Sequence, residues 1–231
     1  MLSAQELEAL ARIDSPTVSN AIEAFGVRDA TSGYASMELQ HFCPESGVML
    51  GYAITCLSDT TMAAPRSPTR EHEFWRVLKD APKPAVVVMK DISSDRMRSC
   101  HAGDVLCSIY RRLGAVGVVT DGAVRDIAGI RERVPGFHVF AAGLVVSHGI
   151  PTVVEFGSTV TICGLSIQPG DLLHGDENGL LVVPLQIAAR IADQSRLVHQ
   201  KERDLLGFIN SDKFDLDGLR QLMSPSSRPK R

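Results

Sequence analysis

Short, continuous runs of hydrophobic residues in the middle of the chain alternate with segments whose apolar residues recur at helical spacing. Residues 85–90 and 115–120 are apolar over most of their length, which is typical of strands buried on both faces of a sheet. Between them, residues 103–112 have the pattern of a helix that ends at Gly114. This alternation predicts an α/β fold. The same reasoning predicts further strands at residues 51–57, 138–141, 152–156, 160–163 and 179–183, and further helices at residues 71–79 and 124–133.

Peripheral helices are predicted at both ends of the chain. Ser3-x-x-Glu6 is a capping box and opens a first helix. Ser15-Pro16 places a cap residue before a first-turn proline, and this pair opens a second helix. Residues 186–206 form the longest helical pattern, near the other end of the chain.

Two segments lack such patterns. Residues 60–70 contain two prolines and several small residues, which predicts a loop. Residues 224–231 combine serine, proline and basic residues and predict a disordered tail. No repeat and no linker divides the rest, so we expect a single domain over residues 1–223.

Composition and charge exclude several classes of protein. The net charge of -3 and the pI near 6.2 give no electrostatic basis for binding nucleic acid. The apolar runs are far shorter than the roughly 20 residues that cross a membrane, and the N-terminus is acidic and amphipathic rather than a secretion signal. Five cysteines without a Cys-x-x-Cys pair favour free thiols in a reducing compartment. We therefore expect a cytoplasmic protein with neither a membrane nor a nucleic-acid partner.

The residues best suited to chemistry are Asp104 and, after a gap of twenty residues, Arg125 and Asp126. Asp104 lies at a predicted helix start opened by Gly103, where unpaired N–H groups attract a carboxylate or phosphate. Arg125 and Asp126 follow a predicted buried strand, and ligands of α/β sheets bind at such strand ends. Carboxylates suit a hard cation such as Mg²⁺, and arginine suits a substrate carboxylate. The alternative is structural: two acidic residues that cap helices, and a surface arginine.

These segments resemble the RraA-like family, which includes the 4-hydroxy-4-methyl-2-oxoglutarate aldolases. The family's enzymes have an Asp, then twenty residues, and then Arg-Asp. Asp104, Arg125 and Asp126 have the same spacing, with no insertion or deletion. Residues 117–126 (Gly-Val-Val-Thr-Asp-Gly-Ala-Val-Arg-Asp) resemble its central signature, and residues 170–184 resemble its closing strand motif. Residues 16–21 resemble its early helix, although Asn20 stands where Asp is common.

The resemblance implies an α/β fold of the swivelling β/β/α type and a lyase that depends on a divalent metal, Mg²⁺ or Mn²⁺. Its substrates would be 4-hydroxy-2-oxo dicarboxylates, cleaved to release pyruvate, with oxaloacetate decarboxylation as a second activity. It implies a homotrimer or a homohexamer. By this likeness Asp126 is the metal ligand, Arg125 binds the 2-oxo acid and stabilises the enolate, and Asp104 orients a metal-bound water. The substrate carboxylate would be held by the backbone N–H groups of Gly103, Asp104, Val105 and Leu106.

Other functions remain open. Some RraA-like proteins bind and inhibit an RNA-degrading endonuclease, and such a regulator needs no catalytic residues. The run from Ser147-His148 to residue 184 is also similar to the end of a phosphohistidine domain, but the glycine-threonine-rich approach to the histidine is missing. A quinone methyltransferase would need a glycine-rich cofactor loop after an early strand, and none is found. His101, His148 and His174 are more typical of structural than of catalytic histidines.

Overall fold

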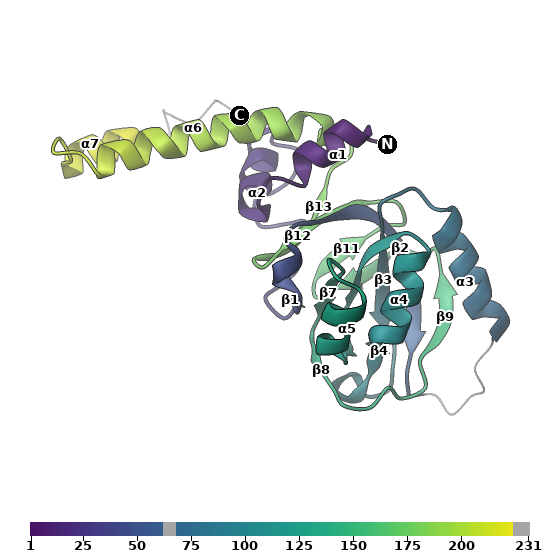
Figure 1. The fold of residues 1–231 in the computed structure, drawn as a ribbon. Coiled ribbons are helices and arrows are strands. Elements are labelled where there is room, and N and C mark those ends of the chain that lie inside the picture. Colours follow the sequence, from purple (N-terminus) through teal and green to yellow (C-terminus); the bar gives the residue numbers. More distant parts are fainter. Residues whose placement is uncertain (62–67, 224–231) are drawn as a thin grey trace.

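The computed structural model describes residues 1–61 and 68–223, and a mixed sheet of eight strands forms its centre (Figure 1). Seven strands follow one another in the order β1-β7-β5-β3-β2-β12-β13, and β9 also pairs with β2. Neighbours among β2, β3, β5 and β7 run parallel, whereas the other pairs are antiparallel. The strands are β1 (Gln40–His41), β2 (Met49–Asp59), β3 (Ala85–Asp91), β5 (Ala115–Thr120), β7 (His138–Ala141), β9 (Thr152–Phe156), β12 (Leu172–Asp176) and β13 (Gly179–Val183).

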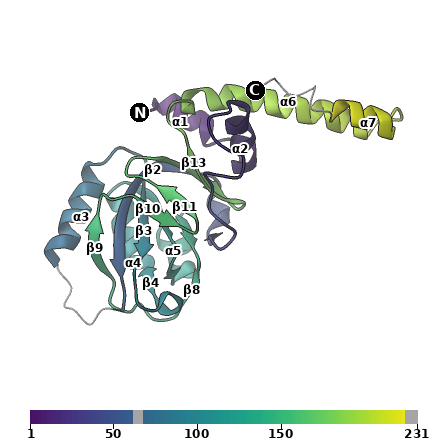
Figure 2. The same ribbon diagram turned by 180° about the vertical axis from the view of Figure 1, so that it is seen from behind.

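The two faces of this sheet are covered by different elements. Helices α3 (Pro68–Asp80), α4 (Asp104–Arg112) and α5 (Ile127–Arg133) lie on one face (Figure 1). The hairpin of β10 (Val160–Ile162) and β11 (Leu165–Ile167) covers the other (Figure 2). Because β3 and β5 are buried on both sides, they need the continuous apolar runs seen in the sequence. The predicted α/β class is confirmed.

A second, small parallel sheet positions the candidate site. It consists of β4 (Cys100–Ala102), β6 (Ala123–Val124) and β8 (Gly143–Leu144), in the order β4-β6-β8. Each of its strands follows one strand of the large sheet along the chain, β3, β5 or β7. The expectation that a helix begins at residue 124 is wrong, because Val124 pairs with Ala102 in this sheet and α5 begins at Ile127.

Helices at both chain ends pack together beside β13. These are α1 (Ala4–Leu10), α2 (Ser15–Ala24) and the first part of α6 (Ile191–Ile209). The far part of α6 projects away and carries α7 (Leu216–Leu222) (Figures 1 and 2). The capping box of Ser3 and Glu6 is formed. The cap of α2 is Asp14 rather than Ser15, because the Asp14 carboxylate accepts from the N–H of Thr17 at 2.9 Å. The predicted peripheral helices are confirmed, although the long helix expected from residue 186 begins only at Ile191, after a 3-10 turn (Ala188–Arg190).

Several boundaries differ from the sequence-based expectations. Helix α3 begins at Pro68, so the last part of the expected loop 60–70 is helical, while residues 62–67 lie outside the described residues. The expected disordered tail, 224–231, also lies outside them. The sequence patterns do not predict strands β1, β4, β6, β8, β11 and β12 or helix α7, since most of these elements are too short to show a period. Within the described ranges, no helix is both long enough and apolar enough to cross a membrane.

Candidate functional site

The predicted residues converge where the strands of the small sheet end. Gly103 follows β4 and Arg125 follows β6, and the N–H of Arg125 donates to the carbonyl of Ala102 at 3.0 Å. A Cβ added to Gly103 would lie 2.8 Å from Oδ2 of Asp126 and 3.4 Å from Nε of Arg125. The missing side chain therefore lets the start of α4 and the Arg125-Asp126 pair approach each other closely.

Asp126 has an unusual backbone conformation. Its φ of 59° and ψ of 34° are left-handed, a conformation that Asp tolerates better than most residues but that still costs free energy. The residue precedes α5, yet its carboxylate makes no capping hydrogen bond. The side chain is 39% exposed and its Oδ2 lies 3.2 Å from Nε of Arg125. The structural alternative of a helix-capping aspartate is therefore not realised at this position.

The Arg125 guanidinium connects two strand ends of the small sheet. Nε faces Asp126, and Nη1 donates to the carbonyl of Val146 at 3.4 Å. Val146 follows β8, so all three strands of the small sheet contribute to the site. Val146 contributes its main-chain carbonyl, and no pattern in the sequence predicts this contact.

Asp104 is the first residue of α4, and both of its carboxylate oxygens have partners. Oδ1 accepts from the N–H of Val105 at 2.7 Å, and Oδ2 forms an ion pair with Arg133 of α5. The predicted cradle of N–H groups at residues 103–106 is thus partly occupied by the chain's own side chain. A bound carboxylate would compete with Asp104 for the N–H of Val105.

The donor set suits a hard divalent cation that keeps most of its water ligands. Asp126 and Asp104 are the carboxylates at this edge, and within residues 1–61 and 68–223 no three His, Cys, Asp or Glu side chains gather as a metal cage. Mg²⁺ and Mn²⁺ accept one or two carboxylates completed by water and substrate oxygens. The Asp126 carboxylate is partly exposed, and Gly103 has no side chain that would cover it. It could therefore bind such a partly hydrated cation.

A buried polar network lies beneath the site. His101 of β4 is fully buried, with Nδ1 at 2.9 Å from the Ser58 hydroxyl and Nε2 at 3.2 Å from Oδ1 of Asp91, although the latter approach lacks hydrogen-bond geometry. Burial alone would raise the pKa of Asp91, but interactions with His101, Ser93 and Ser99 outweigh it and hold that pKa well below its usual range. A Cβ at Gly122 would lie 2.5 Å from the His101 ring. His101 therefore supports the loop that leads to Arg125.

His174 and His148, the other two histidines considered above, have no contact with Asp104, Arg125 or Asp126 among their hydrogen bonds. His174 is buried in β12, and its Nδ1 is 3.0 Å from the hydroxyl of Ser15 in α2. Burial lowers the pKa of His174, which favours a neutral ring that fastens α2 to the sheet. His148 is exposed and lies 2.6 Å from the carbonyl of Gly149.

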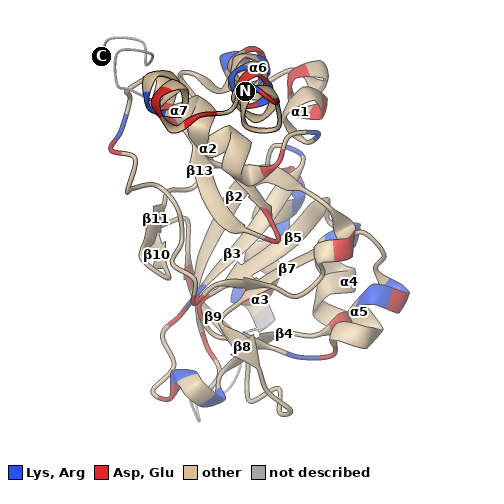
Figure 3. Cartoon of the chain, turned by 90° about the vertical axis from the view of Figure 1, so that its left-hand side faces the viewer, with Lys and Arg blue, Asp and Glu red and all other residues tan. Residues whose placement is uncertain are grey.

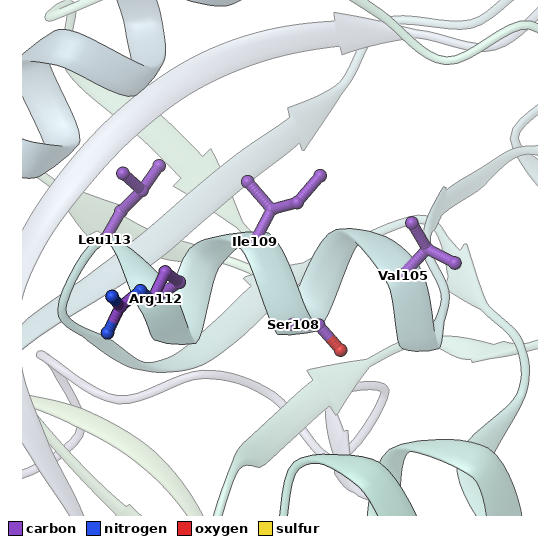
Figure 4. Close-up of a pocket in the computed structure, with 5 residues that line it drawn as sticks. All are labelled: Val105, Ser108, Ile109, Arg112 and Leu113. Atoms are coloured by element: carbon purple, nitrogen blue, oxygen red, sulfur yellow. The ribbon is translucent and has the colours of Figure 1, made fainter.

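An open hollow of about 430 Å³ extends along α4 from the site (Figure 4). Its lining is mostly apolar, and Val105 belongs both to this hollow and to the predicted substrate cradle. Charged residues of both signs are interspersed over the face drawn in Figure 3, including helices α6 and α7. The residues lining the hollow are Val105, Ser108, Ile109, Arg112 and Leu113.

Comparison with known proteins gives a consistent family likeness. Residues 15–182 match the family model described as RraA-like, Aldolase/RraA. A protein of Halalkalibacterium halodurans provisionally named 4-hydroxy-4-methyl-2-oxoglutarate aldolase is 32% identical over 102 residues, covering 44% of this chain and 47% of that protein. The protein DlpA of Legionella pneumophila is 28% identical over 183 residues, covering 77% of this chain and 27% of DlpA. The chain thus matches less than half the length of either relative.

A solved structure shares the fold. Streptomyces coelicolor RraAS2, described as an unusual member of the RNase ES inhibitor RraA protein family, has a TM-score of 0.65 and 24% identity, covering 89% of this chain and 97% of that one. At this identity the likeness concerns the fold.

Proposed function

Because the chain belongs to the RraA-like family, we propose that it is a carbon–carbon lyase of the family's aldolase branch. It cleaves 4-hydroxy-2-oxo dicarboxylates to pyruvate and a second oxo acid, and it decarboxylates oxaloacetate. The observation that carries this proposal is the close approach of Arg125 and Asp126 to the start of α4 at Gly103. A protein that only binds a partner has no need of a strained aspartate beside a guanidinium and a helix start.

The residues divide the chemistry as follows. Asp126 would hold the divalent cation, which, when bound, supplies a positive charge for the developing enolate. Arg125 adds a second positive charge and pairs with the 2-oxo acid. The start of α4, at the N–H of Val105, receives the substrate carboxylate once Asp104 releases that group. Aldol cleavage and decarboxylation both leave a pyruvate enolate, so one set of residues serves both reactions.

The test is pyruvate release from oxaloacetate and from 4-hydroxy-4-methyl-2-oxoglutarate, with Mg²⁺ or Mn²⁺ and after chelation. Chelation is expected to abolish release and metal addition to restore it, while the unfolding temperature changes little, because few protein ligands hold the cation. An undiminished rate in protein verified to be metal-free would contradict the proposed mechanism. No release from either substrate would contradict the lyase itself.

The second candidate is a protein-binding regulator of an RNA-degrading endonuclease. Streptomyces coelicolor RraAS2, which shares the fold, is described as belonging to such an inhibitor family. Val105 and Val146 are apolar side chains exposed at the site, Val146 at 96%. Inhibition of a purified endonuclease by both the wild type and the Asp126→Asn variant, together with no lyase activity, would favour the regulator.

A further inference from the structure

Arg133 reaches the candidate site from a helix that the predicted motif does not include. It lies at the end of α5, where its Nη1 forms an ion pair with Oδ2 of Asp104. The Asp104 side chain is 16% exposed and that of Arg133 is 58% exposed. The carboxylate is therefore fixed from two sides, by the N–H of Val105 and by the guanidinium.

A glycine makes room for this contact. Gly129 lies inside α5, although glycine is the least favourable helix residue apart from proline. A Cβ at this position would lie 2.8 Å from Nη1 of Arg133 and 3.0 Å from Oδ2 of Asp104. A side chain at residue 129 would therefore press on both partners of this ion pair.

The neighbouring Arg131 serves a different purpose. It lies on the same helix, but its guanidinium pairs with Glu45 and donates to the carbonyl of Phe42. The two arginines carry the same charge and belong to the same helix, yet Arg133 is the one that pairs with Asp104. Arg131 is thus a matched control for the charge of α5.

We infer that Arg133 is a positioning residue of the lyase proposed above, on which this inference rests. Through Oδ2 it holds the Asp104 carboxylate between α4 and α5, oriented toward the proposed cation site, while Oδ1 can release the N–H of Val105 to the substrate. Gly129 keeps open the space through which it does so. Residues that orient a catalytic or metal-binding group commonly change the rate 10- to 100-fold when they are removed.

The test uses four variants of the full chain with oxaloacetate and Mn²⁺. Gly129→Ala keeps both charged groups but fills the space, Arg133→Gln removes the charge, Arg133→Lys retains it, and Arg131→Gln is the control. Gly129→Ala and Arg133→Gln are expected to lower kcat roughly tenfold, with KM changed by no more than about twofold. Arg133→Lys restores part of the rate, and Arg131→Gln leaves it unchanged.

Two readouts other than activity accompany the assay. Gly129→Ala should unfold at the same or a higher temperature than the wild type, because alanine favours helix more than glycine does. A loss of rate without a loss of stability separates positioning from a structural role. A crystal structure of Gly129→Ala should show the Arg133 guanidinium turned away from Asp104.

The possible outcomes separate the two proposals. If the wild type is active and kcat is undiminished in both Gly129→Ala and Arg133→Gln, the role of Arg133 is overturned and the proposed lyase activity stands. An equal loss in Arg131→Gln and Arg133→Gln would also overturn it, since the effect would then be one of general charge. A wild type without lyase activity would overturn both proposals.

Discussion

Asp126 and Arg125 have different tasks in the proposed lyase, so their substitutions should have different effects. Asp126→Asn keeps the shape but removes the anionic ligand, and both Mn²⁺ affinity and turnover are expected to fall. Arg125→Ala should leave Mn²⁺ affinity largely intact but slow turnover roughly a hundredfold, equivalent to about 3 kcal/mol of transition-state stabilisation. Calorimetry with Mn²⁺ and steady-state assays measure the two effects. Folded Asp126→Asn with near-normal metal-dependent activity would rule out the assigned ligand.

A control for these variants must remove a charge without disturbing the fold. Asp121 is unsuitable, because it is buried, pairs with Lys90 and accepts from the N–H of Asp91 at 2.9 Å. Glu132 is exposed on α5, so Glu132→Gln removes one negative charge near the site and should leave turnover unchanged.

Gly103 tests the geometry of the same site without changing any charge. In Gly103→Ala the new methyl would lie 2.8 Å from Oδ2 of Asp126 and should displace that carboxylate. We expect turnover to fall roughly tenfold or more, with little change in the unfolding temperature, since φ of Gly103 is −140° and suits alanine. Gly143→Ala is the control, because a Cβ there meets no atom within 4 Å. Equal rates for the two variants would contradict the assigned contact.

At the scale of elements, the edge pair β1–β7 should make stability depend on pH. Burial lowers the pKa of His41 to about 4, and burial with the nearby His41 and Arg111 lowers that of His138 to about 3. In the unfolded chain both rings have a pKa of about 6.5. Both are neutral in the folded protein at neutral pH, so the unfolded chain binds more protons as the pH falls. The free energy of unfolding should therefore decrease as the pH falls from about 6.5 to about 3.

Urea unfolding at several pH values between about 7.5 and about 4 measures this dependence. His138→Phe keeps an aromatic ring beside His41 and should flatten the slope. The slope that remains comes from His41 and the buried His174, among other groups. The exposed His72, changed to Gln, is the control. If the free energy of unfolding depends on pH equally steeply in His138→Phe and in His72→Gln, the pair β1–β7 is not the source of the dependence.

In the molecule as a whole, we expect the arm formed by the far part of α6 and by α7 to take part in self-association. It projects from the rest of the chain (Figure 1) and carries exposed apolar side chains, among them Leu206, Leu216 and Met223. Helix α7 has seven residues and would be marginal on its own, and the resemblance to the RraA-like family implies trimers or pairs of trimers. Sedimentation should therefore give three or six times the 25.0 kDa chain mass. A fully active 25.0 kDa monomer would contradict this expectation.

The class of the fold and the residues worth testing could both be predicted from the sequence. Continuous apolar runs at residues 85–90 and 115–120 marked two strands of the large sheet, because burial on both faces demands them. The cap at Ser3 and the long pattern from residue 186 marked peripheral helices. The spacing of Asp104, Arg125 and Asp126 placed the candidate chemistry next to strand ends and helix starts. Each of these signals depends on residues that are close together in the sequence, so each can be recognised without the structure.

How those residues come into contact depends on the packing of the elements and could not be predicted from the sequence. Strands β6 and β8 have two residues each, too few to show a period, and exist because they pair with neighbours that are distant in sequence. The contact of Arg133 with Asp104 joins residues 29 positions apart across the space left by Gly129. The main-chain carbonyl of Val146 accepts a hydrogen bond from Arg125, and every residue type has such a carbonyl. Such contacts depend on how elements pack, and the residue types at those positions do not specify that packing on their own.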